Sequence, residues 1–486
     1  MKSKKHILFL IVGCMITGCF YIINSPRRFS LIVALLIVAS VTASAFIWRK
    51  GKKFQSLLFL TFFLSFLIKA DYIIYTPTWV RQHDVIGFGA GFGQAGFIEY
   101  FYENFRLLSV DPRDFWGFFQ PPLHHMTAAL WLKVQVLLGY SYPHACENIQ
   151  VLTLFYSCMV TWFAYFIFKE LSFEKRELVA ATALVAFHPS FILMSGSINN
   201  DMLCILFQIM SIYFFLRFSK EKKWKDVIFL AVCVGCSMMS KLSGVLIAPA
   251  LGISFLYSLI KNKKDRIKEF CKLMVFGIIS IPLGIWSPVR NLIKFNLPLN
   301  YTPEVGEPVG MHSLLARCFD FRTKTPFSNM IGNGNAFDEF NVMLTMLKTS
   351  LFGEYNYGDK LSIVVIPAWI LLIIGAVFMA FLFYITWQET FRKDSSLSIQ
   401  NRIFFFVYYC TSLLFFLNLS FSIPNFSSMD FRYIAYIIVV EAIYYAVFLK
   451  SPHYKEGIKR VSLVLLSVFC VISVCIYFLL GTVSWQ

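Results

Sequence analysis

Residues 361–385 read LSIVVIPAWILLIIGAVFMAFLFYI, a run without a single aspartate, glutamate, lysine or arginine. An α-helix needs about 20 predominantly apolar residues to cross the hydrocarbon core of a bilayer. This run is long enough to cross as one helix, and no charged side chain in it would have to leave water. It therefore predicts an integral membrane protein, and the rest of the chain can be searched for runs of the same kind.

The composition of the whole chain supports the same interpretation. Of its 486 residues, 58% are hydrophobic and 15% are charged, whereas a typical soluble chain is about 25% charged. No soluble core has room for so much apolar surface, so an all-α, polytopic membrane protein with about 13 transmembrane helices is expected. The predicted spans are residues 6–24, 29–48, 54–73, 150–168, 177–193, 202–217, 227–241, 243–260, 270–287, 361–385, 403–422, 432–449 and 461–482.

Basic residues indicate how these spans are oriented. The formal net charge is +17, and most lysines and arginines fall in short loops on one side if the spans alternate. The positive-inside rule makes that side cytoplasmic. The excess positive charge thus reflects topology, and nucleic acid is not an expected partner. A multi-pass protein of a plasma membrane is expected, of bacterial type, with its N-terminus in the cytoplasm.

Three parts of the chain follow from this pattern. Residues 1–53 hold two preceding spans, residues 54–450 form the membrane core, and residues 451–486 hold a last span. Gly13-Cys14 and Gly18-Cys19 resemble a lipoprotein signal box, but an uncleaved first span is expected, because small residues before a cysteine are common in apolar runs. The topology of 227–260 is open, because both flanks are basic and the stretch is short for two full spans.

Two long outer loops carry most of the polar sequence, at about residues 71–149 and 288–360. In the first, Phe97, Phe101, Phe105 and Leu108 recur at helical spacing, which predicts an amphipathic helix at the membrane interface. The stripe of Phe340, Leu344, Leu347 and Leu351 predicts another in the second loop. The ionisable groups gather at the outer ends of the spans rather than in their middles. This layout favours chemistry at the outer interface over conduction through the membrane.

Acidic and histidine side chains of the outer face supply the first candidate site residues. Asp84 can act as a general base on an acceptor hydroxyl, although a lone loop acid is usually only solvated; Asp71 is the competing candidate. His124 and His125 open a helix after two prolines. Because adjacent helical positions point about 100° apart, they do not form a metal-binding pair.

Amides and cations at the span ends complete the set. Asn200 and Asp201 open a span, where Asp201 is also a good helix start. Lys241 lies between two apolar runs, and Arg290 and Arg432 lie at outer span ends. Each of these three cations can bind a lipid phosphate or can simply reach the interface with its charged end.

The order of these features resembles a known family. An outer-loop acid, Pro121-Pro122-Leu123, Asn200-Asp201, Lys241-Leu242-Ser243-Gly244, Arg290-Asn291 and Arg432-Tyr433 follow one another. Together they are similar to the integral-membrane glycosyltransferases of the glycosyltransferase-C superfamily. The similarity is to the protein-mannosyltransferase and aminoarabinose-transferase type (family 39), and it covers most of residues 54–450. Two positions depart from the family pattern: Val85 follows Asp84 where the family often has Asp-Glu, and Gln120 stands where it often has histidine.

The resemblance implies an inverting transfer of a sugar from a polyprenyl-phosphate donor to a glycan, lipid or protein acceptor at the outer face. On that basis Asp84 (or Asp71) would be the base, Lys241, Arg290 and Arg432 would bind the phosphate, and Asn200, Asp201, His124 and His125 would shape the substrate site. No cofactor is certain, and metal use varies within the family. A transporter or flippase of a lipid-linked glycan is the alternative, and a non-catalytic membrane scaffold is a third.

Overall fold

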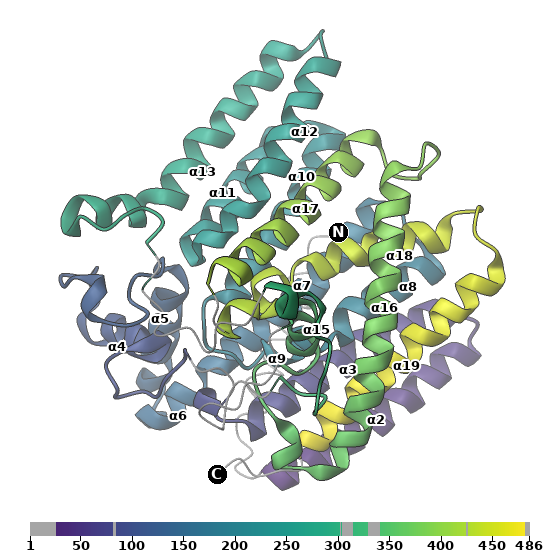
Figure 1. The fold of residues 1–486 in the computed structure, drawn as a ribbon, viewed down its shortest axis with the longest axis horizontal. Coiled ribbons are helices and arrows are strands. Elements are labelled where there is room, and N and C mark those ends of the chain that lie inside the picture. The colour runs from purple at the N-terminus through teal and green to yellow at the C-terminus, as the bar shows by residue number, and fades with distance from the viewer. Residues whose placement is uncertain are drawn as a thin grey trace.

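The computed structural model describes residues 26–80, 84–301, 303, 314–328, 341–423 and 426–481, and all regular elements within these ranges are helices (Figure 1). This confirms the predicted all-α class. The α-helices are α2 (Pro26–Arg49), α3 (Lys53–Tyr75), α4 (Gly93–Asn104), α5 (Leu123–Leu137), α6 (Tyr142–Glu147), α7 (Ile149–Glu170), α8 (Lys175–Phe187), α9 (Pro189–Leu193), α10 (Asp201–Glu221), α11 (Trp224–Ser240), α12 (Ala248–Lys261), α13 (Arg266–Phe295), α14 (Leu314–Phe319), α15 (Val342–Phe352), α16 (Val365–Phe391), α17 (Ile399–Ser422), α18 (Ile437–Lys450) and α19 (Glu456–Leu480).

Within the described residues, nine helices are long and apolar enough to cross a membrane. The short helices Ser427–Ile434 and α18 form a tenth candidate, bent by 50°. The chain is thus a multi-pass membrane protein. The nine are Ile32–Arg49, Lys53–Tyr75, Tyr142–Glu170, Asp201–Glu221, Leu242–Lys261, Arg266–Phe295, Ser362–Phe391, Ile399–Ser422 and Glu456–Leu480.

The expected count of thirteen spans is not confirmed. The predicted span 6–24 lies outside the described residues. The predicted span 177–193 corresponds to α8 and α9, which have 13 and 5 residues and meet at His188-Pro189. Proline cannot donate the backbone hydrogen bond that would continue α8, and its ring disfavours a helical residue before it. The predicted span 227–241 corresponds to α11, which has 17 residues.

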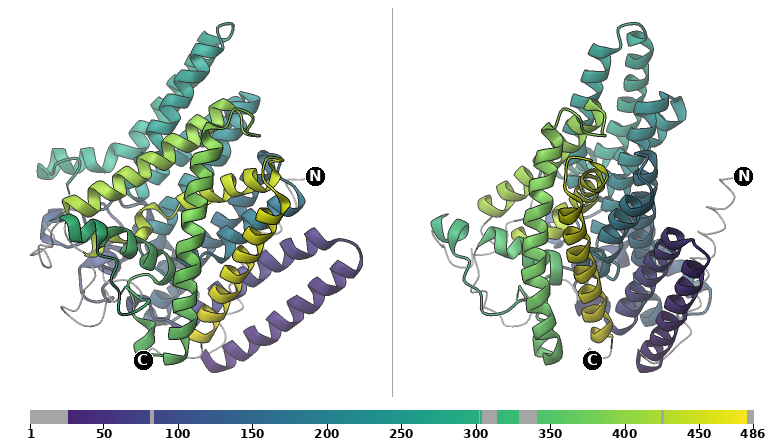
Figure 2. Two further views of the ribbon diagram at one scale, coloured as in Figure 1. Left: turned by 45° about the vertical axis from the view of Figure 1, so that its right-hand side comes forward. Right: turned by 90° about the vertical axis from the view of Figure 1, so that its right-hand side faces the viewer.

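Helix α18 lies at the centre of the bundle, and every residue from Ile437 to Leu449 is buried. A helix this apolar has no polar face to present to water, so it packs inside; its buried carboxylate, Glu441, accepts a hydrogen bond from the Tyr409 hydroxyl at 2.8 Å. Helices α8 and α16 flank it, and α10, α11 and α13 form a second group of closely packed helices (Figures 1 and 2). The α2–α3 hairpin lies at the edge of the bundle, against α7, α8 and α19.

The first outer loop folds into a small helical unit at one end of the bundle, formed by α4, α5 and α6 (Figure 1). The helix expected near residues 94–108 is present as α4, but the role expected of its apolar stripe needs correction. Phe97 and Phe101 are buried against α5 and Phe118 rather than turned to lipid. Phe105 is exposed, because α4 has ended and this residue has a positive φ of 48°.

Close contact between α11 and α13 depends on two glycines. A Cβ atom on Gly235 would lie 2.8 Å from Leu283 Cβ, and one on Gly284 would lie 2.8 Å from Met238 Sδ. Small residues of this kind let helix backbones approach closely in membranes, where apolar lipid offers no hydrophobic force to pull helices together.

We therefore expect Gly235→Val to lower the free energy of unfolding by about 1–3 kcal/mol through overpacking. Thermal unfolding in detergent measures this loss. Gly277→Val is the matched control, because a Cβ atom there has only Ile281 Cδ1 nearby, at 3.8 Å. Equal losses at both positions would show that the close contact does not limit stability.

Candidate active site

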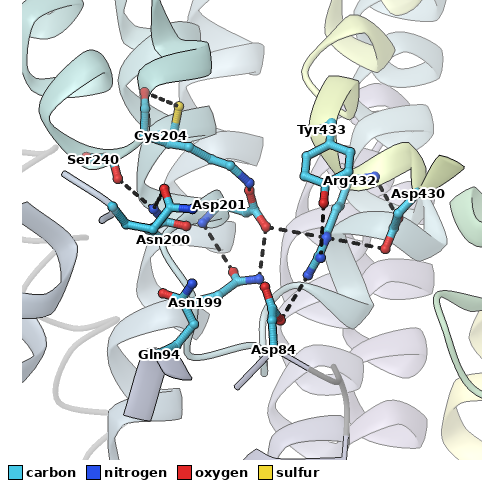
Figure 3. A network of polar contacts seen from close by, with 12 residues as sticks. Asp84, Gln94, Asn199, Asn200, Asp201, Cys204, Ser240, Asp430, Arg432 and Tyr433 are labelled. Atoms are coloured by element: carbon cyan, nitrogen blue, oxygen red, sulfur yellow. Dashed lines mark hydrogen bonds and ion pairs between the residues drawn. The ribbon is translucent and has the colours of Figure 1, made fainter. Parts of the chain in front are cut away.

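Four carboxylates converge on the guanidinium of Arg432, close to the ends of α10, α11 and α18. Arg432 Nη1 lies 3.3 Å from Asp84 Oδ1, and its Nε lies 3.3 Å from Asp430 Oδ2 and 3.7 Å from Asp201 Oδ2 (Figure 3). Arg432 Nη2 lies 3.6 Å from Glu354 Oε1. The Arg432 side chain is only 5% exposed. Bringing so many carboxylates together inside a protein requires such a cation, because their repulsion is poorly screened there.

Lys241 supplies a second cation to the same group. Its ammonium pairs with Asp201 Oδ1 and lies 4.5 Å from the centre of the Tyr433 ring. The lysine occupies the break between α11 and the 3-10 helix Leu242–Ile247. Gly244 makes this turn tight, since a Cβ atom there would lie 2.5 Å from the Ser237 carbonyl carbon. We call Arg432, Lys241 and the four carboxylates the Arg432 cluster.

Local hydrogen bonds hold the acids in place. Asp430 Oδ1 accepts from the backbone N–H of Arg432 at 2.9 Å and so caps the 3-10 helix Phe431–Ile434. Asp201, the first residue of α10, accepts from Asn199 Nδ2 at 2.9 Å. Asn200 Nδ2 donates instead to the Ser240 carbonyl at 2.8 Å, which links the start of α10 to the end of α11 (Figure 3).

The two predicted histidines lie on α5, and both are fully buried. His124 Nε2 is 2.7 Å from the Ile198 carbonyl oxygen, and His125 Nε2 is 2.6 Å from Gln94 Oε1. Burial lowers the pKa of His124 to about 4 and that of His125 well below its ordinary value. Both imidazoles are therefore neutral at pH 7, and they join α5 to the segment before α10 and to α4.

Like the histidines, the predicted site residues Asp71 and Arg290 lie apart from the Arg432 cluster. Asp71 is fully buried within α3, where its carboxylate faces Gly481 at the end of α19. Arg290 is half-buried in α13 and donates to the Leu108 carbonyl oxygen and to Asn291 Oδ1. None of these partners belongs to the cluster, so the geometry favours Asp84 over Asp71 as the acid beside the cations.

The sequence patterns did not identify two members of the cluster, Asp430 and Glu354. Asp430 stands two residues before Arg432, and Glu354 follows Gly353 at the end of α15. The Asp430-Phe431-Arg432 spacing is a turn pattern that could have drawn attention to Asp430. Nothing local distinguishes Glu354, whose importance comes only from the packing of α15 against Phe431–Ile434.

The cluster does not fit a divalent metal. Its carboxylates face the Arg432 guanidinium, which occupies the point where a metal ion would have to lie. Within the described ranges, no three histidine, cysteine, aspartate or glutamate side chains are placed to hold a metal ion together. We therefore assign no step to a metal.

Comparisons with known proteins agree with this architecture. A family model described as dolichyl-phosphate-mannose-protein mannosyltransferase matches residues 126–288. The dolichyl-phosphate-mannose–protein mannosyltransferase 2 of Candida albicans is 22% identical over 232 residues, which cover 44% of this chain and 29% of that protein.

Solved structures of archaeal enzymes share the fold. The Archaeoglobus fulgidus oligosaccharyltransferase in its apo form aligns over 90% of this chain and 57% of its own, with a TM-score of 0.51 and 13% identity. The oligosaccharyltransferase AglB of A. fulgidus, in complex with an inhibitory peptide and a dolichol-phosphate, gives 0.50, with 12% identity over 90% of this chain and 56% of that one.

The chain thus spans less than a third of the Candida relative and little more than half of the archaeal chains. Within that overlap, the resemblance to membrane glycosyltransferases of the glycosyltransferase-C type is confirmed. The shared part is an all-helical membrane fold, and the matched residues 126–288 include Asn200, Asp201 and Lys241.

Proposed function

We propose that the protein is a glycosyltransferase that moves a sugar from a polyprenyl-phosphate donor to an acceptor hydroxyl. The observation that carries this proposal is the Arg432 cluster. It combines two cations that can bind a phosphate with one partly exposed carboxylate that can accept a proton. Asp84 is 18% exposed at its side chain, and the other three acids are 4% exposed or less. The names of the relatives, which refer to dolichyl phosphate and to mannosyl transfer, support the same class of donor.

Each residue of the cluster has a proposed role. Lys241 and Arg432 stabilise the negative charge that develops on the leaving phosphate, where fixed cations lower the barrier most. Asp84 accepts the acceptor's hydroxyl proton while the acceptor oxygen bonds to the anomeric carbon and the bond from that carbon to the phosphate oxygen breaks. A single displacement of this kind inverts the anomeric configuration. Asn199 orients Asp201, Asn200 ties the start of α10 to the end of α11, and the buried histidines position the loop.

Arg290 lies outside this arrangement. Its contact with the Leu108 carbonyl oxygen ties α13 to the middle of the first outer loop. We propose that Arg290 supports this loop. Replacing Arg290 would then change the affinity for donor only by moving the loop.

The side of the membrane on which transfer occurs follows from charge. Asp84 follows α3, Asp201 begins α10, Lys241 follows α11 and Arg432 precedes α18. The opposite ends of these helices carry basic turns, such as the turn that includes Lys222 and Lys223. Applying the positive-inside rule, we propose that the basic turns face the cytoplasm and that the cluster faces outside. A flippase would need polar groups along a route through the bundle, whereas these groups gather at one end.

Reconstitution tests the proposal. Purified protein in liposomes is given polyprenyl phosphates that carry a radiolabelled hexose or pentose, together with membrane extract as a source of acceptors. Transfer of label to a product that is no longer attached to polyprenyl phosphate is the expected result. Movement of labelled lipid between leaflets without transfer would favour the transporter alternative.

A further inference from the structure

We propose that the donor's phosphate displaces Asp84 from Arg432, so that donor binding itself releases the catalytic base. This inference rests on the proposed function and adds an order of binding to it: donor first, acceptor second.

The cations of the cluster are already neutralised in the absence of donor. Four carboxylates surround two cations, which leaves two negative charges in excess if every acid is ionised, and one bound proton would still leave one. A phosphate that approaches such a site is repelled unless one carboxylate moves away from its cation. Phosphate binding and carboxylate binding therefore compete for the same guanidinium.

Asp84 is held by fewer contacts than Asp201 or Asp430. Among the described residues, its carboxylate contacts Arg432 alone, at 3.3 Å. Asp201 also pairs with Lys241 and accepts from Asn199, and Asp430 also accepts from the Arg432 backbone. Asp84 is also the most exposed of the four, so moving it into water costs less desolvation energy than moving any of the others.

Its place in the chain makes the displacement local. The Asp84 backbone oxygen accepts from the N–H of Gln94 at 3.2 Å, which anchors the residue's main chain to the start of α4. The side chain can therefore rotate away from Arg432 while the loop keeps its position. Once displaced, the carboxylate lies free of its guanidinium partner and is available to accept a proton from an acceptor hydroxyl. Without donor it stays paired, so an acceptor that arrives first meets no free base.

The test is the affinity of the protein in nanodiscs for undecaprenyl phosphate, a probe with the phosphate and without the sugar. Asp84→Asn removes the competing charge, so we expect it to bind the probe about tenfold more tightly than wild type, the equivalent of one hydrogen bond to a charged group. Asp84→Glu keeps the charge and should bind like wild type. Asp114→Asn, another aspartate of the outer loop, removes a charge that has no contact with Arg432 and should also bind like wild type.

Labelling of carboxylates with a carbodiimide provides a second measurement on the wild type. Addition of undecaprenyl phosphate should speed labelling of Asp84 relative to that of Asp114, because the Asp84 side chain then leaves its ion pair with Arg432. Equal affinities of wild type and Asp84→Asn, or weaker binding by Asp84→Asn, would contradict the displacement of Asp84 by phosphate. The proposal that the protein binds a polyprenyl-phosphate donor would still stand. If wild type does not bind the probe at all, the proposed function itself fails.

Discussion

Replacing Asp84 with asparagine should lower the rate of sugar transfer by about 10²–10⁴-fold, the usual contribution of a general base. Asparagine has nearly the same shape but cannot take a proton from the acceptor. The side chain is partly exposed and has one ion pair in the described structure, so the variant should fold and remain in the membrane. Initial rates with a labelled donor, at equal amounts of protein, measure the effect.

Two controls make this result specific. Asp114→Asn should retain the wild-type rate, since it changes charge in the same loop away from the cluster. Asp71→Asn tests the competing candidate, whose carboxylate faces Gly481 inside the bundle. If transfer survives in Asp84→Asn and disappears in a folded Asp71→Asn protein, the base assignment is wrong.

Replacing Arg432 with glutamine should lower the free energy of unfolding by about 3–5 kcal/mol, because it leaves buried carboxylates without their cation. Thermal unfolding in detergent gives the difference from wild type. A stability equal to that of wild type would show that the carboxylates do not need the Arg432 charge.

Arg432→Lys separates charge from shape. Lysine keeps the positive charge but has one compact ammonium in place of the planar guanidinium. It cannot contact Asp84, Glu354 and Asp430 together as the guanidinium does. Its free energy of unfolding should therefore fall between those of wild type and Arg432→Gln. Expressed as a free energy, its loss of transfer rate should exceed its loss of stability.

The sequence alone predicted the class of fold and part of the site. Long apolar runs such as residues 361–385 specify membrane helices regardless of what packs around them. The candidates Asp84, Asp201, Lys241 and Arg432 were found because each is an ionisable residue beside an apolar span, and the structure brings these four together. Their convergence could not be predicted, because it depends on how α3, α10, α11 and α18 pack.

Most of what sequence reasoning missed depends on tertiary packing. Glu354 matters only through its tertiary contact with Arg432, which no local pattern encodes, whereas Asp430 belongs to a local turn that was not recognised. Phe97 and Phe101 form an amphipathic stripe that would suit a membrane surface, but α5 covers them. Periodicity identifies an apolar face, whereas what covers that face is decided by the rest of the chain.

The central claim is that phosphate and base meet at the Arg432 cluster. A structure determined with a non-hydrolysable polyprenyl phosphonate sugar tests it most directly. The account predicts the phosphonate between Lys241 and Arg432, with Asp84 turned from the guanidinium toward the anomeric carbon. A phosphonate bound elsewhere, such as at Arg290, with the Asp84–Arg432 pair intact, would contradict it.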